Sequence, residues 1–88
     1  MVTLFGSPNF DVGLARVFAP GSYNHDQLSY STLYTMPVQS LIVPSGLSLV
    51  LFKDFYLESE SKTIMGPAKI DLKSNPDFKD WNMQINSI

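Results

Sequence analysis

Short apolar or alternating segments, each closed by turn-forming residues, recur along the whole chain. Branched aliphatic and aromatic residues in such runs favour β-strands, and glycine and proline between them favour turns. We therefore predict strands over residues 1–5, 14–18, 38–43, 47–52, 61–65, 69–72 and 85–88. Residues 23–34 are polar and rich in tyrosine, and a short strand with an irregular turn is expected there. The apolar run 47–52 is predicted to be the most buried of these strands.

A seven-residue segment, here called the phrase, occurs twice, once near the middle of the chain and once at its end. Residues 35–41 read Thr-Met-Pro-Val-Gln-Ser-Leu, and residues 82–88 read Asn-Met-Gln-Ile-Asn-Ser-Ile, at an offset of 47 positions (83 − 36). The same offset aligns Tyr34 with Trp81, which we interpret as paired core or corner residues. Two copies of one unit are too few for a solenoid, so we expect them to pack on each other.

Several short strands with Pro/Gly turns between them predict an all-β fold. With the repeat, this becomes two Greek-key motifs forming a β-sandwich with an internal pseudo-twofold axis. We expect a single domain over residues 1–88, with the first Greek key at 1–43 and the second at 47–88, because no linker is long enough to separate domains.

Composition narrows the possible functions. The 88 residues contain no cysteine, which excludes disulfides and thiolate metal sites. A net charge of −2 with 16% charged residues offers no basic face for nucleic acid. No apolar run has the length of a membrane span, and the first residues show no signal peptide, so the localisation stays open.

Candidates for catalysis are few. His25 is the only histidine and sits in a polar loop, where a solvated side chain is the simpler interpretation. The chain has no Gly-x-Ser-x-Gly elbow and no glycine-rich phosphate loop. The carboxylates of residues 58–60 and 71–80 are interpreted as a solvated edge, with an acid/base pair as the alternative. We predict that the protein is not an enzyme.

The order and spacing of several short motifs point to a family. Each half opens with a strand that ends in an aromatic residue and closes with a serine followed by a large aliphatic residue. The segments that carry the likeness are Phe5 and Phe52, Ala19-Pro20-Gly21-Ser22-Tyr23, Asp26-Gln27-Leu28, Val43-Pro44-Ser45-Gly46, Ser40-Leu41 and Ser87-Ile88. In these features the chain resembles the βγ-crystallin domain, in particular the microbial type of protein S. The resemblance implies two Greek keys in one sandwich.

The sequence departs from that family at two kinds of position. The family's hairpins carry aromatic-x-Gly, but residues 10–12 and 57–59 lack the glycine, which Gly13 supplies one residue late in the first half only. In the family's calcium motif, the second position is Met36 or Met83 here, and a thioether is a poor ligand for calcium. The aligned positions that keep oxygen atoms are Thr35, Gln39, Asn82 and Asn86. We therefore expect no cofactor, with weak calcium binding as the alternative.

Three large residues, Phe55, Tyr56 and Leu57, fall where an exposed hairpin tip is expected. They predict either a hairpin folded over the sandwich or a contact patch for a protein partner or a second copy of the chain. We predict a non-enzymatic structural, stress or assembly domain of βγ-crystallin type. The alternatives are a calcium-binding domain of this type and a small secreted toxin-like or inhibitor-like effector of the same fold.

Overall fold

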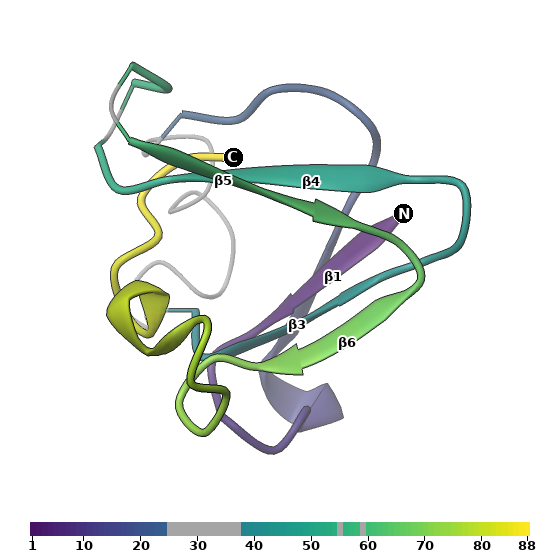
Figure 1. Ribbon diagram of the computed structural model, residues 1–88. Helices are drawn as coiled ribbons and strands as arrows, with labels where there is room; N and C mark the ends of the chain where they lie inside the picture. The colour runs from purple at the N-terminus through teal and green to yellow at the C-terminus, as the bar shows by residue number, and fades with distance from the viewer. Residues whose placement is uncertain (25–37, 55, 59) are drawn as a thin grey trace.

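The computed structural model describes residues 1–24, 38–54, 56–58 and 60–88, which form six strands and two 3₁₀ turns (Figure 1). The strands are β1 (Val2–Phe5), β2 (Ala15–Phe18), β3 (Ser40–Val43), β4 (Ser48–Phe52), β5 (Ser61–Met65) and β6 (Ala68–Asp71). The 3₁₀ turns are η1 (Val12–Leu14) and η2 (Lys79–Trp81). Six of the predicted strands are confirmed. No helical segment among these residues is long and apolar enough to cross a membrane.

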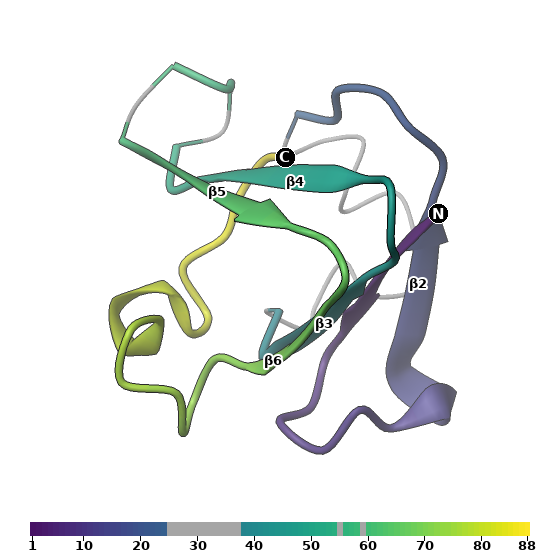
Figure 2. The ribbon, with the colours of Figure 1, turned by 45° about the vertical axis from the view of Figure 1, so that its right-hand side comes forward.

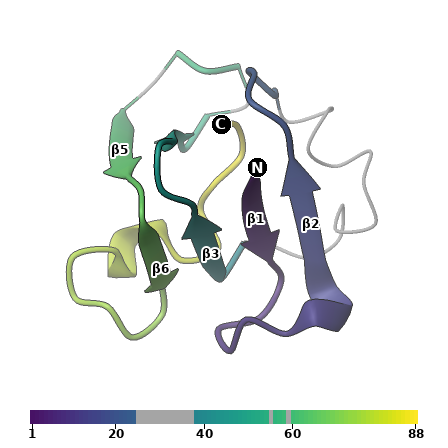
Figure 3. The same cartoon turned by 90° about the vertical axis from the view of Figure 1, so that its right-hand side faces the viewer.

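The strands form two antiparallel sheets, and the larger sheet contains strands from both halves of the chain. One sheet has the order β2-β1-β3-β6, and the other pairs β4 with β5. Strand β6 comes from the second half, yet it pairs with β3 of the first half in the register Leu41↔Ile70 (Figures 2 and 3). Strand β6 thus joins the second half of the chain to the sheet of the first half, and the predicted all-β sandwich is confirmed.

The segment 85–88 was predicted to be a strand, but it forms a single bridge between Ser87 and Phe52. The backbone N–H groups of Asn86 (3.0 Å) and Ser87 (3.4 Å) both point to the carbonyl oxygen of Phe52, so two residues oppose one. A bulge of this kind interrupts the ladder. The bonds to Phe52 place the last residues beside the end of β4 (Figure 1). Beyond the bulge, Ile88 exchanges two backbone hydrogen bonds with Tyr23, of 2.8 and 3.0 Å.

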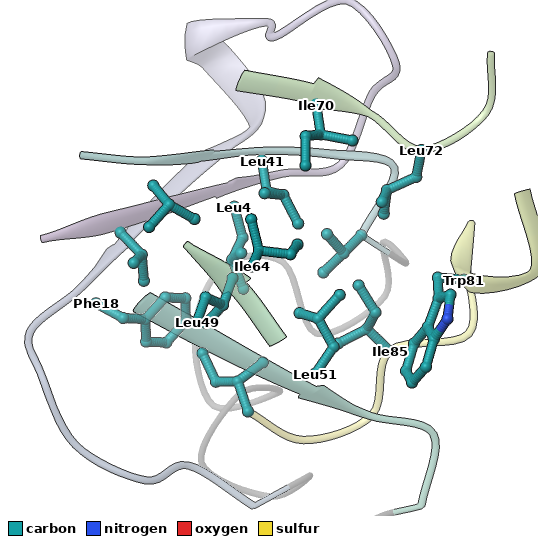
Figure 4. Close-up of a cluster of buried hydrophobic side chains, with 14 residues drawn as sticks. Leu4, Phe18, Leu41, Leu49, Leu51, Ile64, Ile70, Leu72, Trp81 and Ile85 are labelled. Atoms are coloured by element: carbon teal, nitrogen blue, oxygen red, sulfur yellow. The ribbon is translucent and has the colours of Figure 1, made fainter. Parts of the chain in front are cut away.

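The core lies between the facing sides of the two sheets (Figure 4). Leu4 and Leu41 of the larger sheet point towards Leu49 and Leu51 of β4. The prediction that residues 47–52 are the most buried run is wrong, because β4 alternates: Leu49 and Leu51 are buried, whereas Ser48 is exposed. One face of β4 covers the core and the other faces outwards, as in an antiparallel sandwich.

Candidate functional site: two repeated loop junctions

The repeated phrase lies where the turn after an opening strand meets the segment that closes the same half. We call these places the first and second junctions. The first junction comprises Gly6, Ser7, Gln39 and Ser40, and the second comprises Lys53, Asp54, Asn86 and Ser87. The members correspond one to one at the sequence offset of 47. In each junction a turn that follows β1 or β4 supplies backbone carbonyls, and the closing segment supplies hydrogen-bond donors.

A side-chain amide donates to the turn in both junctions. The Nε2 of Gln39 lies 2.9 Å from the carbonyl oxygen of Gly6, and the Nδ2 of Asn86 lies 2.8 Å from that of Lys53. The backbone N–H of each amide residue binds the carbonyl one position earlier, in the pairs Gln39–Phe5 (2.9 Å) and Asn86–Phe52 (3.0 Å). Each amide residue thus holds two successive carbonyls of its turn.

The serine that follows holds a third carbonyl. The hydroxyl of Ser87 donates to the carbonyl oxygen of Asp54 at 2.7 Å, and the hydroxyl of Ser40 donates in the same way to Ser7. Both serines are fully buried. A buried hydroxyl needs such a partner because an unmade hydrogen bond in the interior costs about 1–3 kcal/mol. Three successive carbonyls of each turn are therefore satisfied by two residues of the closing segment.

The hairpin beyond each junction departs from the family pattern in its own way. Phe10 (φ 54°) and Leu57 (φ 65°), which are related by the repeat, adopt the left-handed backbone conformation, whereas Gly13, the middle residue of η1, does not. A large residue in this conformation costs on the order of 1–3 kcal/mol. Part of that cost is offset in the first hairpin, where the Phe10 ring packs edge-on against Phe5 at 5.6 Å between centroids.

Polar groups near the start of each turn hold the hairpins. The carboxylate of Asp54 accepts hydrogen bonds from the backbone N–H groups of Tyr56 and Glu58, both at 3.0 Å. In the first hairpin, the hydroxyl of Ser7 accepts one from the N–H of Asp11 at 3.2 Å. These bonds hold two hairpins that lack the glycine of the family pattern.

The remaining motif positions fall into two groups. Thr35, Met36 and the other residues of 25–37, including His25 and Tyr34, lie outside the described residues. In the second phrase, Met83 has a φ of 63° and is half exposed, and its N–H donates to the carbonyl of Val38 at 3.0 Å. This bond brings the two copies of the phrase side by side.

Trp81, just before the second phrase, and Asn82, its first residue, differ in whether their buried groups have partners. Trp81 is buried, as expected for a core residue, with the ammonium of Lys53 4.9 Å from its ring centroid. The Oδ1 atom of Asn82 is also buried, and the described residues offer it no hydrogen-bond partner. Among the buried side-chain nitrogen and oxygen atoms of the described residues, it alone lacks a hydrogen-bond partner.

The described side chains do not fit a calcium ion. Calcium takes six to eight oxygen ligands, preferably carboxylates and carbonyls. At both junctions the amide nitrogen, and not the amide oxygen, faces the nearest turn carbonyl, so a donor already occupies that oxygen. No group of three His, Cys, Asp or Glu side chains suited to a metal occurs in the described part of the chain. An ion that binds the Gly6 or Lys53 carbonyl oxygen would compete with the amide for that oxygen.

The three residues of the predicted contact patch differ in exposure and in whether the structure describes them. Phe55 lies outside the described residues, Tyr56 is 61% exposed, and Leu57 is half buried. The backbone N–H of Leu57 binds the hydroxyl of Ser87 at 3.1 Å, which ties this part of the hairpin to the second junction. Tyr56 thus remains the candidate contact residue among the described members of the patch.

An apolar hollow lies apart from the junctions, near the N-terminus and the last residue. Its lining residues, none of which has a charged side chain, are Val2, Phe18, Ala19, Pro20, Gly21, Tyr23, Leu47, Ser48, Leu49 and Ile88. The Tyr23 hydroxyl donates to the carbonyl of Ala19 at 2.8 Å, so its polar end is already used. A ligand site usually combines apolar walls with several convergent polar groups, which this hollow lacks.

Two packed antiparallel sheets, with β6 of the second half in the sheet of the first half and one junction in each half, define the class of fold. Comparison with solved structures shows that this fold is the fold of βγ-crystallin domains. A single-substitution variant of a βγ-crystallin domain from Clostridium beijerinckii matches with a TM-score of 0.76 and 23% identity, over 99% of this chain and 95% of that one. The N-terminal domain of protein S matches with a TM-score of 0.74 and 22% identity, over 98% and 89%.

The chain therefore has the βγ-crystallin fold over nearly its whole length, as the resemblance implied. Identities of 22–24% establish the fold and leave the activity to be argued from the site. No protein-family model matches the sequence, and no curated protein matches it either.

Sequence reasoning missed how the site works. It singled out Gln39 and Asn86 for their oxygen atoms, but both act through nitrogen. The carbonyl partners, which belong to Gly6 and Lys53, have no sequence signature because every residue carries a backbone carbonyl. The available signal was the recurrence of an amide followed by serine at the same offset of 47.

Proposed function

We propose that this protein is a non-enzymatic structural domain of βγ-crystallin type, with weak or no calcium binding, that serves in a scaffold, coat or stress assembly. The observation that supports the proposal is the matched closure of both junctions. In each half, three successive turn carbonyls are held by donors of the protein itself. Closure of this kind stabilises the hairpins without an added ion, which suits a module whose work is mechanical.

Calcium titration of the unaltered protein tests the proposal. The melting temperature is expected to stay the same between EDTA and about 1 mM Ca²⁺, with Mg²⁺ at equal concentration as the control for ionic strength. A calcium site with a Kd about one hundredth of that Ca²⁺ concentration would add about 2.7 kcal/mol to the free energy of unfolding. The melting temperature of a domain this small would then rise by about 10 °C or more. A rise of that size would favour the calcium-binding alternative instead.

Exposure of Tyr56 favours a second candidate, a binding module that acts through the turn joining β4 and β5. The side chain is 61% exposed, while the turn beneath it is held by Asp54. Replacing Tyr56 with alanine is expected to change the free energy of unfolding by less than about 0.5 kcal/mol in urea titrations. A loss above about 2 kcal/mol would show that the ring packs on the sandwich and would remove this candidate.

A further inference from the structure

We infer that the side-chain amides of Gln39 and Asn86 take the place of a cation at the two junctions. Each provides the positive partner that a turn carbonyl needs, and each closes its hairpin from within the chain. This inference rests on the proposed structural function and gives it a mechanism. It also predicts that loss of the amide donor, with the shape of the side chain kept, creates a requirement for a divalent cation.

The second junction carries the argument furthest. The Nδ2 of Asn86 lies 2.8 Å from the carbonyl oxygen of Lys53 and 3.4 Å from that of Gln84. An amide nitrogen has two hydrogens, and here each has a carbonyl oxygen to meet. A nitrogen that bridges two carbonyl oxygens performs the electrostatic task of a bound cation, with partial charges in place of a full one.

The neighbouring carbonyls strengthen the need for a positive partner. The carbonyls of Phe52, Lys53 and Asp54 all accept hydrogen bonds from Asn86 and Ser87, so their negative ends converge on one short segment. Convergent carbonyl dipoles repel one another unless donors or a cation lie among them. The first junction repeats the pattern with Gln39, whose Nε2 bonds to Gly6.

Exchange of the amide for a carboxylate reverses the sign of the contact. In Asn86→Asp, an oxygen without a hydrogen replaces Nδ2 and faces the carbonyl oxygen of Lys53. Two acceptors at this separation repel, and a divalent cation between them relieves the repulsion by binding both.

The experiment compares melting temperatures of the full chain and its Asn86→Asp variant in EDTA, about 1 mM Ca²⁺ and about 1 mM Mg²⁺. We expect the variant to melt at least about 5 °C below the unaltered protein in EDTA and to regain most of that loss with Ca²⁺. The unaltered protein is expected to show no response. Equal melting of the two proteins in EDTA, or a variant indifferent to Ca²⁺, would overturn the inference.

Asn75→Asp is the matched control. Asn75 is half buried like Asn86, but it uses its Oδ1 as an acceptor, from the backbone N–H of Asp77 at 2.9 Å. A carboxylate accepts the same bond and adds the same charge, so this variant is expected to keep its melting temperature and to ignore calcium. A calcium response as large as that of Asn86→Asp would show that added charge alone is responsible and would also overturn the inference.

Gln39→Glu provides an independent variant should Asn86→Asp fail to fold. Its nitrogen meets one turn carbonyl at 2.9 Å, so the same effect is expected at a smaller size. Failure of the inference is distinguishable from failure of the proposed function. A calcium response of the unaltered protein refutes the proposed function, whereas a variant that responds no more than the unaltered protein refutes the role of the amides.

Discussion

Replacement of Leu41 by alanine is expected to lower the free energy of unfolding by about 2–5 kcal/mol. Leu41 is fully buried in β3, which lies between β1 and β6 in the larger sheet. It pairs with Leu4 on one side and Ile70 on the other, and its side chain points towards the second sheet (Figure 4). Removal of three carbons leaves a cavity that surrounding strands cannot close, because both neighbours are held by backbone hydrogen bonds.

The loss is large against the whole stability of such a domain. At about 0.05–0.15 kcal/mol per residue, a chain of this length has about 4–13 kcal/mol to lose. Urea denaturation followed by tryptophan fluorescence reports the change through the midpoint, since Trp81 is buried in the same core. Val17→Ala on the edge strand β2, where the side chain is 55% exposed, is the control and should cost well under about 1 kcal/mol. Equal losses in the two variants would contradict the placement of β3 at the centre of the core.

Replacement of Gly66 by alanine is expected to lower the free energy of unfolding by about 2–3 kcal/mol. Gly66 lies between β5 and β6, and its N–H donates to the carbonyl of Leu47 at 2.9 Å. A Cβ added there would overlap the carbonyl oxygen of Pro44 and lie 3.0 Å from that of Leu47. These obstacles are backbone atoms of the turn between the halves, so no side-chain rotation relieves the overlap.

Alanine variants at two other glycines distinguish the effect of this overlap from the general effect of replacing glycine by alanine. At Gly13 the nearest atom to an added Cβ is the Oδ1 of Asp11 at 3.3 Å, and the change should be below about 1 kcal/mol. At Gly46 the space is open but φ is 86°, so about 1–2 kcal/mol of backbone strain is expected without any clash. Chemical denaturation of the three variants measures the order of their losses in the free energy of unfolding. A smaller loss at Gly66 than at Gly13 would show that the turn at Pro44 moves freely.

Much of the fold followed from local pattern. Apolar or alternating segments bounded by turn residues predicted the ends of six strands to within about two residues. The pattern is informative because the side chains of a half-buried strand alternate between core and solvent. The offset of 47 found in the sequence reappears in the structure as matched hydrogen bonds of the two junctions. Two predictions failed because neighbouring segments decide which faces of a strand are buried and whether its ladder is regular. Residues 47–52 are buried on one face only, and residues 85–88 bulge at Phe52.

The sequence by itself determined that the chain is an all-β sandwich built from two similar units, and that Gln39 and Asn86 occupy equivalent places. Only the tertiary structure decided what those amides do. An amide side chain carries both an acceptor and a donor, and nothing in the sequence shows which of them meets a partner. Here the turns after β1 and β4 present backbone carbonyls to Gln39 and Asn86, so the nitrogen faces them. Where the sequence suggested remnants of a metal site, the fold places hydrogen-bond donors.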